Sequence, residues 1–374
     1  MKQNKIALLI SNMMTLGGTE RVTALLANQL SSEFPCSVII GHQDGPLVYP
    51  INSLVDIFVA HRKRNKRKLD VFESAYKIAK YLRKEEIELL LVIGRNNSVV
   101  PFLVKCLYPK VKIIFCEHNT INNCAMPLNF LLKVKGMIYQ ALVNYLSSEI
   151  VVLTDKDFEY YRARYPSIST KLSKIVNISE LVLDKDILYN SHSKRIVSVG
   201  RIDVQKGYEY TVEVAKRVFA KHPDWSWDIW GTGTSQYTQK IQRMIEEAGL
   251  SNNLHLCGTD PDIYKRYKDY SFYCMTSRWE GLPMVLLEAQ ASKLPIISFN
   301  IYSGPSEVIT NGINGELIEP WNVDIMADSI NHLIENQDLR KHYSNHSQDD
   351  LGKFSAHSIL QQWKILIQKY IDEG

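Results

Sequence analysis

The sequence predicts an α/β protein with two domains, each built on a doubly wound parallel sheet. The chain has 374 residues, which corresponds to two domains at roughly 100–200 residues per domain. Short apolar runs alternate with amphipathic helical stretches along its whole length. The apolar runs are continuous, as is typical of parallel strands that are buried on both faces. Regular alternation of such strands with helices favours doubly wound folds.

Strands of the first domain are predicted at Ile6–Ile10, Ser37–Ile40, Leu89–Ile93, Val111–Cys116 and Ile150–Leu153. Helical patterns between them include Glu20–Leu30, Val71–Arg83 and Asp155–Arg164. A second series of strands is predicted at Arg195–Val199, Ser226–Trp230, Leu254–Cys257, Phe272–Met275, Pro295–Phe299 and Glu316–Ile318. We therefore expect two Rossmann-like domains that face each other across a cleft, at the carboxyl ends of their strands, where such sheets bind ligands.

The domain boundary is placed in Ser179–Lys194, which is polar, rich in turn-forming residues and without a clear period. The first domain then covers residues 1–180, a linker covers 181–194 and the second domain covers 195–355. Apolar residues at helical spacing between Ile359 and Tyr370 predict a terminal helix within 356–374. We expect this helix to pack back toward the first domain.

The formal net charge of +4 comes from one segment. His61–Lys68 reads HRKRNKRK and contains six basic residues, so the rest of the chain sums to −2. Such a cluster favours an anionic membrane surface or a pyrophosphate lipid, and a solvated charged loop is the alternative. Nucleic acid is not expected, because no aromatic residues are interleaved with the bases. The residues proposed for membrane or acceptor contact are Arg62, Lys63, Arg64, Lys66, Arg67 and Lys68.

Cysteine usage and hydropathy favour a cytoplasmic protein. None of the six cysteines forms a C-x-x-C pair, and no histidine follows at zinc-site spacing, so no metal site is expected. The N-terminal apolar run is short for a secretion signal, and no run reaches about 18 apolar residues. The segment Leu128–Leu146 is apolar on two helical faces and contains Lys133 and Lys135. It is either a core helix or a helix that touches lipid or a polyprenyl acceptor.

Two predicted strand-to-helix loops carry features that suit phosphate. In SNMMTLGGT, Gly17 and Gly18 let backbone amides approach an anion at the start of a helix, although a plain turn is the alternative. In VSVGRIDVQKG, Arg201 and Lys206 offer a planar fork and a point charge suited to a diphosphate. Two solvated loop charges are the alternative. A third loop, WGTGTSQ, fails the dinucleotide fingerprint because Gln236 stands at the third glycine position.

The strongest candidate site is TSRWEGLPMVLLEAQASKLP, which follows a predicted strand. Pro283 suits the first turn of a helix, and the apolar run Met284–Leu287 predicts that this helix is buried. A carboxylate on a buried helix is costly without a partner, so Glu288 calls for a ligand or a salt bridge. Glu280 precedes the helix by one turn, and the amides of Gly281, Leu282 and Pro283 lie between the two carboxylates in sequence. A further loop, YSGPSEVITNGIN, is expected at the same sheet edge.

These motifs resemble the family-4 retaining glycosyltransferases, which have the two-domain GT-B architecture. The resemblance covers nearly the whole chain through GGTERV, EHN, VGRIDVQKG, SRWEGLPMVLLEAQ, SGPSEVI and NGINGELIEP. The SGPSEVI variant looks like bacterial enzymes that build surface polysaccharides on lipid carriers. The resemblance implies transfer of a hexose or N-acetylhexosamine from a nucleotide-diphosphate sugar, with UDP expected. The implied acceptor is a polyprenyl-pyrophosphate-linked glycan of O-antigen, capsule or exopolysaccharide synthesis, which would place the enzyme peripherally on the inner face of the cytoplasmic membrane.

The resemblance also implies a role for each matched residue. Glu280 would contact the transferred sugar and Glu288 the nucleotide ribose. Arg201 and Lys206 would neutralise the diphosphate, and His118 would contact the sugar near the reacting carbon. The remaining donor-binding positions would be Gly17, Gly18, Gly281, Leu282, Pro283 and Met284.

Retention of the anomeric configuration is the implied mechanism, with the nucleotide sugar as co-substrate and no cofactor or metal. The chain departs from the family pattern at Lys293, where a glycine usually ends the helix that carries the second glutamate. A left-handed cap without glycine costs about 1 kcal/mol. At Asn177 the usual following glycine is Ile178, and no role is transferred there.

Two other functions stay open from the sequence. A sugar-nucleotide 2-epimerase of similar architecture would use the donor without an acceptor, and the Glu280 and Glu288 pair argues against it. A non-catalytic protein that binds sugar nucleotides or lipid would be expected to lose the charges named above.

Overall fold

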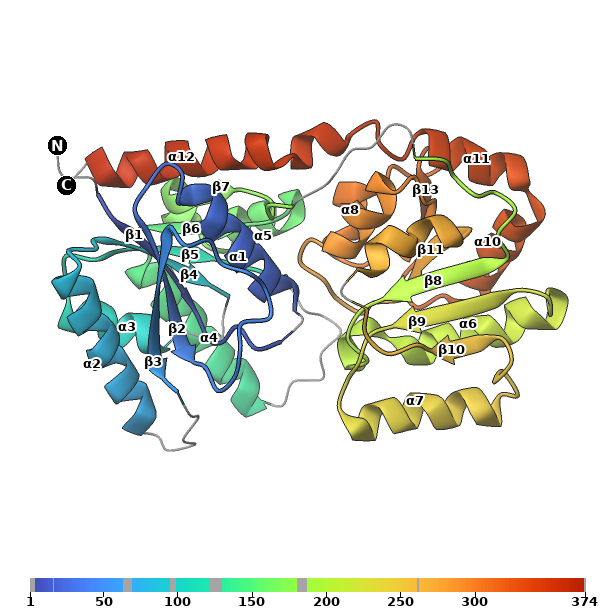
Figure 1. Cartoon of the computed structure of the whole chain (residues 1–374), viewed down its shortest axis with the longest axis horizontal. Helices are drawn as coiled ribbons and strands as arrows, with labels where there is room; N and C mark the ends of the chain where they lie inside the picture. The colour runs from blue at the N-terminus through green and yellow to red at the C-terminus, as the bar shows by residue number, and fades with distance from the viewer. Residues whose placement is uncertain are drawn as a thin grey trace. The chain divides into compact units, whose positions relative to one another are not determined.

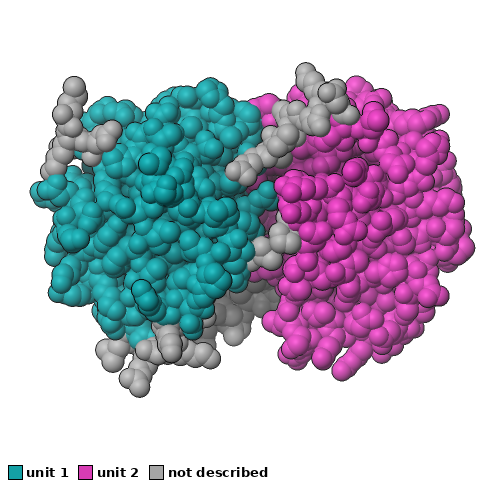
Figure 2. All heavy atoms as spheres, in the orientation of Figure 1, with its two compact units in different colours: residues 1–180, 354–374 teal, residues 181–353 magenta. Residues whose placement is uncertain are grey.

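The computed structural model describes residues 4–15, 17–62, 69–94, 99–120, 130–179, 187–260 and 262–372. The chain divides into two compact units (Figure 2). Unit 1 comprises Met1–Glu180 and Phe354–Gly374, and unit 2 comprises Leu181–Lys353.

Unit 1 is built on a seven-stranded parallel sheet in the order β3-β2-β1-β4-β5-β6-β7 (Figure 1). Its strands are β1 (Ile6–Ile10), β2 (Cys36–His42), β3 (Val55–His61), β4 (Leu89–Ile93), β5 (Lys112–Cys116), β6 (Glu149–Val152) and β7 (Leu172–Lys174). Its helices are α1 (Gly18–Leu30), α2 (Leu69–Lys84), α3 (Val99–Leu107), α4 (Phe130–Leu146), α5 (Asp155–Arg164) and α12 (Ala356–Asp372).

Helices cover both faces of this sheet. Ala7 and Leu9 of β1 belong to a buried cluster with side chains of α2, α3, α4 and α5. Because strand side chains alternate between faces, Ile6, Leu8 and Ile10 point to the other face, where α1 contacts β1 and β2. The sheet is therefore doubly wound, as predicted.

The terminal helix α12 belongs to unit 1 and contacts α1 (Figure 1). Its Tyr370 hydroxyl donates to the buried carboxylate of Glu149 at 2.6 Å, and its backbone oxygen accepts from Lys112 Nζ at 2.8 Å. Lys364 forms an ion pair with Glu33 at 2.6 Å. These contacts attach the end of the chain to its first unit.

Unit 2 is built on a six-stranded parallel sheet in the order β10-β9-β8-β11-β12-β13. The strands are β8 (Arg195–Val199), β9 (Ser226–Trp230), β10 (Leu254–Leu256), β11 (Phe272–Met275), β12 (Ile296–Phe299) and β13 (Gly315–Ile318). The helices are α6 (Tyr208–Lys221), α7 (Ser235–Glu247), α8 (Met284–Ala291), α9 (Pro305–Val308), α10 (Val323–Glu335) and α11 (Gln337–Asn345).

One core of unit 2 lies between its sheet and helices α6, α7 and α10, and α8 lies on the other side of the sheet (Figure 1). Trp227 of that core is fully buried, and its indole N–H donates to Ser198 Oγ at 2.9 Å. The fold class predicted from the sequence, with two doubly wound parallel α/β domains, is confirmed.

The structure differs from the sequence prediction in two strands and in the linker. Strands β3 and β7 were not predicted; β3 lacks a continuous buried run, because Asp56 and Ile57 are exposed within it. Residues 187–194, expected within a linker at 181–194, are part of unit 2, and residues 181–186 lie outside the described ranges. Arg340 donates to the backbone oxygen of Ser191 at 2.9 Å, and the Tyr189 hydroxyl donates to that of Ser271 at 2.6 Å. Hydropathy carries no signal for such side chain to backbone bonds.

Candidate functional site

The loop after β8 brings Arg201 and Lys206 into one short turn. The Asp203 carboxylate accepts a hydrogen bond from the Lys206 backbone N–H at 3.3 Å and caps the 3-10 turn Val204–Lys206. The next residue, Gly207, has a left-handed φ of 64°, and a Cβ there would overlap the carbonyl oxygen of Thr276. Only glycine therefore fits where the turn meets α6 and approaches the loop after β11.

Lys206 and Glu280 form an ion pair, with 2.7 Å between Nζ and Oε1. The two side chains are 14% and 9% exposed. The same Oε1 accepts a hydrogen bond from Ser277 Oγ at 2.7 Å, and Oε2 accepts one from Gln205 Nε2 at 3.4 Å. The structure thus brings two of the predicted site residues, Lys206 and Glu280, together in a salt bridge.

Arg201 lies on the exposed side of this pair. Its side chain is 64% exposed, and Nη2 lies 3.5 Å from Asp203 Oδ2 and 3.3 Å from Gln205 Oε1. A guanidinium has five N–H donors, so most of its hydrogen-bonding capacity is available to a ligand. The turn therefore presents one buried and one exposed cation.

The loop after β11 leads through Glu280 and the buried residues Gly281 and Leu282 into α8. Pro283 was predicted in the first turn, but its ψ of 101° is extended, and α8 begins at Met284. The apolar run is also less buried than predicted, because Met284 and Val285 are partly exposed while the two leucines that follow are buried. The amphipathic exposure of α8 could not be read from a run that is apolar throughout.

Glu288 lies in the middle of α8 and is partly buried. Burial raises the pKa of the Tyr273 hydroxyl well above its ordinary value, and the charges of Glu280 and Glu288 add to that shift. The Tyr273 hydroxyl bonds to the backbone of Val199, just before the Arg201 turn. Both predicted carboxylates therefore act on one buried group behind that turn.

The loop after β12 packs against the Glu280 loop, as expected for loops at one sheet edge. Gly304 has a φ of 106°, and a Cβ there would overlap the backbone oxygen of Gly281 and lie 3.3 Å from Glu280 Cβ. Glycine at this position lets the two loops touch.

Arg278 connects the Arg201 turn to the loop after β11, a role that sequence reasoning did not assign to it. Its backbone N–H donates to the Gln205 oxygen at 2.7 Å, and Nη1 donates to the Val204 oxygen at 2.6 Å. Nη1 also lies 3.1 Å from Glu209 Oε2. Although burial alone would raise the pKa of Glu209, hydrogen bonds from Tyr237 and Lys240 and the charge of Arg278 lower it to about 2. Arg278 is therefore bound to protein groups.

In unit 1 the helix α1 begins directly after Gly17, whose backbone is extended. A Cβ at Gly17 would overlap the carboxylate of Glu20, which also accepts a hydrogen bond from the Thr15 hydroxyl. Gly18 is exposed, with open space where its Cβ would be. The structure therefore places a protein carboxylate beside one of the two predicted glycines and leaves the other accessible.

His118 follows β5 and forms a hydrogen bond with Asn177. Burial lowers the pKa of His118 to about 4 despite this bond, so the imidazole is neutral at pH 7. Its Nε2 is buried and has no hydrogen-bond partner within the described residues. The loop that carries His118 is fixed by Thr120, whose hydroxyl donates to the Asp157 carboxylate at 2.7 Å. Asn177 is the contact that sequence reasoning missed.

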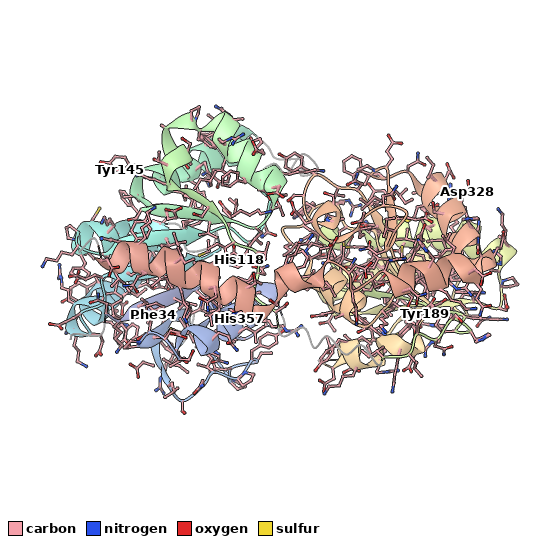
Figure 3. All side chains as sticks on the ribbon, turned by 90° about the horizontal axis from the view of Figure 1, so that it is seen from above. Phe34, His118, Tyr145, Tyr189, Asp328 and His357 are labelled. Carbon is pink, nitrogen blue, oxygen red and sulfur yellow. The ribbon has the colours of Figure 1, made fainter. Side chains whose placement is uncertain are left out.

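The predicted membrane residues are described only in part. Arg62 is exposed at the end of β3, whereas Lys63, Arg64, Lys66, Arg67 and Lys68 lie outside the described residues. Helix α4 has a buried side, as expected of a core helix, and it also exposes apolar side chains. Gln140 and Val143 are buried, while Met137, Ile138 and Tyr145 are 68%, 58% and 82% exposed. Tyr145 is labelled in Figure 3. Within the described ranges, no helix is both long and apolar enough to span a membrane.

Comparison with known proteins shows which family unit 2 is similar to. Residues 182–350 match the model of the family described as glycosyl transferases group 1. The amylovoran biosynthesis glycosyltransferase AmsD of Erwinia amylovora is 26% identical and covers 97% of this chain and 99% of its own. The N-acetylgalactosamine-N,N'-diacetylbacillosaminyl-diphospho-undecaprenol 4-alpha-N-acetylgalactosaminyltransferase of Campylobacter jejuni is 24% identical and covers 92% and 94%.

The fold is also similar to that of a solved structure. A variant of TarM from S. aureus, crystallised with fondaparinux, alpha-GlcNAc-glycerol and UDP, superposes with a TM-score of 0.81 over 97% of this chain and 99% of its own, at 16% identity. The family match spans the unit that holds Arg201, Lys206 and Glu280, and similarity to glycosyltransferases continues through unit 1. The chain is therefore similar to the group 1 glycosyltransferases over residues 182–350 and to named glycosyltransferases over nearly its whole length.

Proposed function

We propose that the protein is a retaining glycosyltransferase that moves a hexose or N-acetylhexosamine from a UDP-sugar to a lipid-linked glycan during polysaccharide synthesis. The main support for a nucleotide-sugar donor is the Lys206–Glu280 pair. It holds a cation suited to phosphate 2.7 Å from a carboxylate suited to sugar hydroxyls. The acceptor class is supported by the names of two relatives, one in amylovoran biosynthesis and one acting on an undecaprenyl-diphosphate-linked sugar.

Glu280 has capacity left for a sugar hydroxyl. A carboxylate has about four lone-pair positions, and Lys206, Ser277 and Gln205 occupy three of them within the described residues. The remaining position is on Oε2. We assign Glu280 to the transferred sugar on this basis.

Lys206 and Arg201 are assigned to the donor diphosphate. An ammonium has three N–H donors, and Lys206 uses one of them on Glu280, so it can bind phosphate without leaving the carboxylate. The exposed guanidinium of Arg201 can add a bidentate contact. In unit 2, Glu288 is proposed to bind the ribose, and the backbone N–H groups of Gly281, Leu282 and Met284 to bind the sugar or phosphate. Pro283 lies between them and has no N–H.

In unit 1, His118 is proposed to contact the transferred sugar, and Gly17 and Gly18 the diphosphate or acceptor. A neutral imidazole whose Nε2 is buried and unpartnered within the described residues has one position for a hydroxyl. The Glu20 carboxylate beside Gly17 would repel a phosphate, so an anion at this helix start requires Glu20 to move.

The proposed reaction forms a bond between the acceptor oxygen and the anomeric carbon on the face from which UDP leaves. The bond from that carbon to the diphosphate oxygen breaks, and the acceptor proton passes to a donor phosphate oxygen. Lys206 and Arg201 stabilise the negative charge that develops on the leaving group. We propose that these two cations do the work that a metal ion does elsewhere, so transfer should persist in EDTA.

For the acceptor side, we propose that unit 1 contacts an anionic membrane through α4 and the basic run that begins at Arg62. The exposed apolar residues of α4 share that helix with the exposed Lys135. An interfacial helix of this kind buries its apolar face among acyl chains while its lysines meet headgroups. The triple substitution of Met137, Ile138 and Tyr145 by serine should weaken flotation with phosphatidylglycerol vesicles. Ile365→Ser on α12, where Ile365 is 73% exposed, is the matched control. Equal flotation of both variants would contradict the proposal.

The activity is tested by screening UDP-sugars for thermal stabilisation and then for transfer to polyprenyl-pyrophosphate-linked acceptors. Product NMR should show the anomeric configuration of the donor, and an inverted product would contradict the mechanism. Conversion of the donor to its 2-epimer without acceptor would instead identify an epimerase. Lys206→Ala should abolish transfer, while Lys216→Ala, at an exposed ion pair on α6, should not change it.

A further inference from the structure

Gln205 touches two charged groups of the proposed donor site, Arg201 and Glu280. It directly precedes Lys206 and is partly buried. Its Oε1 accepts a hydrogen bond from Arg201 Nη2 at 3.3 Å, and its Nε2 donates to Glu280 Oε2 at 3.4 Å and to the Trp279 oxygen at 3.0 Å. One side-chain amide therefore links the exposed cation to the buried carboxylate.

The orientation of this amide is fixed by chemistry. Arg201 has only donors to offer, while the Trp279 carbonyl and the Glu280 carboxylate have only acceptors. A flipped amide would set an oxygen against two acceptors and an NH₂ group against a guanidinium. The Gln205 oxygen and nitrogen can therefore occupy only one arrangement, which no other amino acid of similar shape reproduces.

The backbone of Gln205 is fixed as well. Its carbonyl oxygen accepts from the Arg278 N–H at 2.7 Å, and the preceding carbonyl, of Val204, accepts from Arg278 Nη1 at 2.6 Å. The Asp203 cap holds the other side of the turn. The side chain thus projects from a rigid turn, so its amide can set the position of its neighbours rather than follow them.

We propose that Gln205 is a positioning residue, which holds the Arg201 guanidinium toward the diphosphate and the Glu280 carboxylate toward the transferred sugar. This inference rests on the proposed function. Gln205 itself need not touch the donor. The NH₂ group of Gln205 occupies one hydrogen-bonding position on Glu280 Oε2, so a sugar hydroxyl is left with the other position. The Gln205 Oε1 atom restricts the conformation of the Arg201 side chain, which is 64% exposed.

Two variants of nearly equal volume separate positioning from packing. Gln205→Glu keeps the shape and the bond to Arg201 but sets an ionised oxygen against Trp279 O and Glu280. When the introduced carboxyl takes up a proton, its O–H can donate again, so function should return as the pH falls. Gln205→Met removes all three side-chain hydrogen bonds at every pH, so its loss of activity should not depend on pH.

The experiment measures kcat and KM for transfer by the full chain between pH 5.5 and 8.5, together with the affinity for UDP. At pH 8, Gln205→Glu should lower kcat/KM about 10- to 100-fold, the range expected when a hydrogen bond to a charged group is lost. The kcat/KM of this variant, divided by that of the wild type at the same pH, should rise at least several-fold as the pH falls to 5.5. For Gln205→Met the ratio should stay constant. Gln239→Glu, at an exposed position on α7, is the control for added charge and should match the wild type throughout.

The outcomes distinguish this inference from the function on which it rests. If the wild type transfers sugar and Gln205→Glu follows its pH profile, the positioning role is wrong and the proposed function stands. If the wild type transfers no sugar, the proposed function fails, and UDP affinity tests Gln205 alone. A Gln205→Glu variant that binds UDP like the wild type at every pH then overturns the inference.

Discussion

Replacing Lys206 by methionine tests whether the Lys206–Glu280 pair also supports the fold. The substitution removes the ammonium and leaves Glu280 with Ser277 and Gln205 as hydrogen-bond donors. Because the Glu280 side chain is only 9% exposed, water cannot replace the lost partner. Breaking a buried pair on one side typically costs 3–5 kcal/mol. We expect Lys206→Met to lower the free energy of unfolding of unit 2 by about 3 kcal/mol.

The double variant Lys206→Met with Glu280→Gln separates the lost charge partner from lost packing. Glutamine removes the unpaired charge and can still accept a bond from Ser277. The double variant should therefore be more stable than Lys206→Met alone by about 2 kcal/mol, since replacing both members of a buried pair is often nearly neutral. An exposed pair, Glu213 and Lys216 on α6, is the matched control, with side chains 43% and 46% exposed. Its double-mutant coupling should be below about 0.5 kcal/mol.

Urea unfolding at pH 7.5, followed by tryptophan fluorescence, measures these energies. Unit 2 contains five of the six tryptophans, at positions 225, 227, 230, 279 and 321, so the signal mainly reports that unit. Lys206→Met within 1 kcal/mol of the wild type, or a double variant no more stable than the single one, would refute the reasoning. Neither Lys206→Met nor the double variant should transfer sugar, so recovery of stability without recovery of activity separates the two roles of the pair.

Three further changes have expected results. Lys293→Gly should raise the stability of unit 2 by about 0.5–1 kcal/mol and its melting temperature by about 2 °C, because Lys293 has a φ of 55°; an unchanged or lower temperature would contradict this. Gly207→Ala should lower both stability and transfer, because a Cβ overlaps Thr276; wild-type unfolding and turnover would be inconsistent with that contact. His118 should titrate near pH 4 by NMR. Because the unfolded chain takes up this proton near pH 6.5, stability should fall between pH 6.5 and 4, by at most about 1.4 kcal/mol per unit, and His118→Gln should flatten that slope.

The prediction at Lys293 shows where sequence reasoning worked well. Lys293 stands where a glycine usually ends the helix that carries Glu288, so a left-handed backbone is predicted at Lys293. Its φ of 55° confirms this prediction. The Lys293 N–H donates to the Gln290 oxygen at 2.9 Å and the Leu294 N–H to that of Ala289 at 2.9 Å, which is the Schellman pattern. A local motif is predictable because its geometry depends on neighbouring residues alone.

Strands were predictable for the same kind of reason. Runs such as those of β1 and β4 are buried at every residue, and continuous apolar sequence signals this directly. The edge strand β3 lacks that signal, because one side of an edge strand has no neighbouring strand and Asp56 is tolerated there. The difference between these strands and β3 depends on where each strand lies in the sheet, and a local sequence pattern carries no information about that.

The site shows a different limit. Arg201, Lys206 and Glu280 were identified by residue type and motif, yet the bonds that organise them join residues more than seventy positions apart. Gln205 and Arg278 carry no sequence signal of their own, since an amide and a guanidinium beside a charged motif look like solvated loop residues. Their roles appear only when the loops after β8 and β11 are placed together. The same holds for Asn177, whose contact with His118 crosses from one strand end to another.

The arrangement of charges in unit 2 indicates how a donor would bind. The buried Glu280 carboxylate and Lys206 ammonium neutralise each other. Neither is therefore an isolated buried charge, which would be energetically costly. The pair nevertheless keeps two N–H donors on Lys206 and one acceptor position on Glu280 within the described residues. A diphosphate and a sugar hydroxyl can therefore be added without breaking the pair or leaving a buried group unsatisfied. Because its groups are already oriented by Ser277, Gln205 and the Asp203 cap, the site should bind a donor with little rearrangement of these side chains.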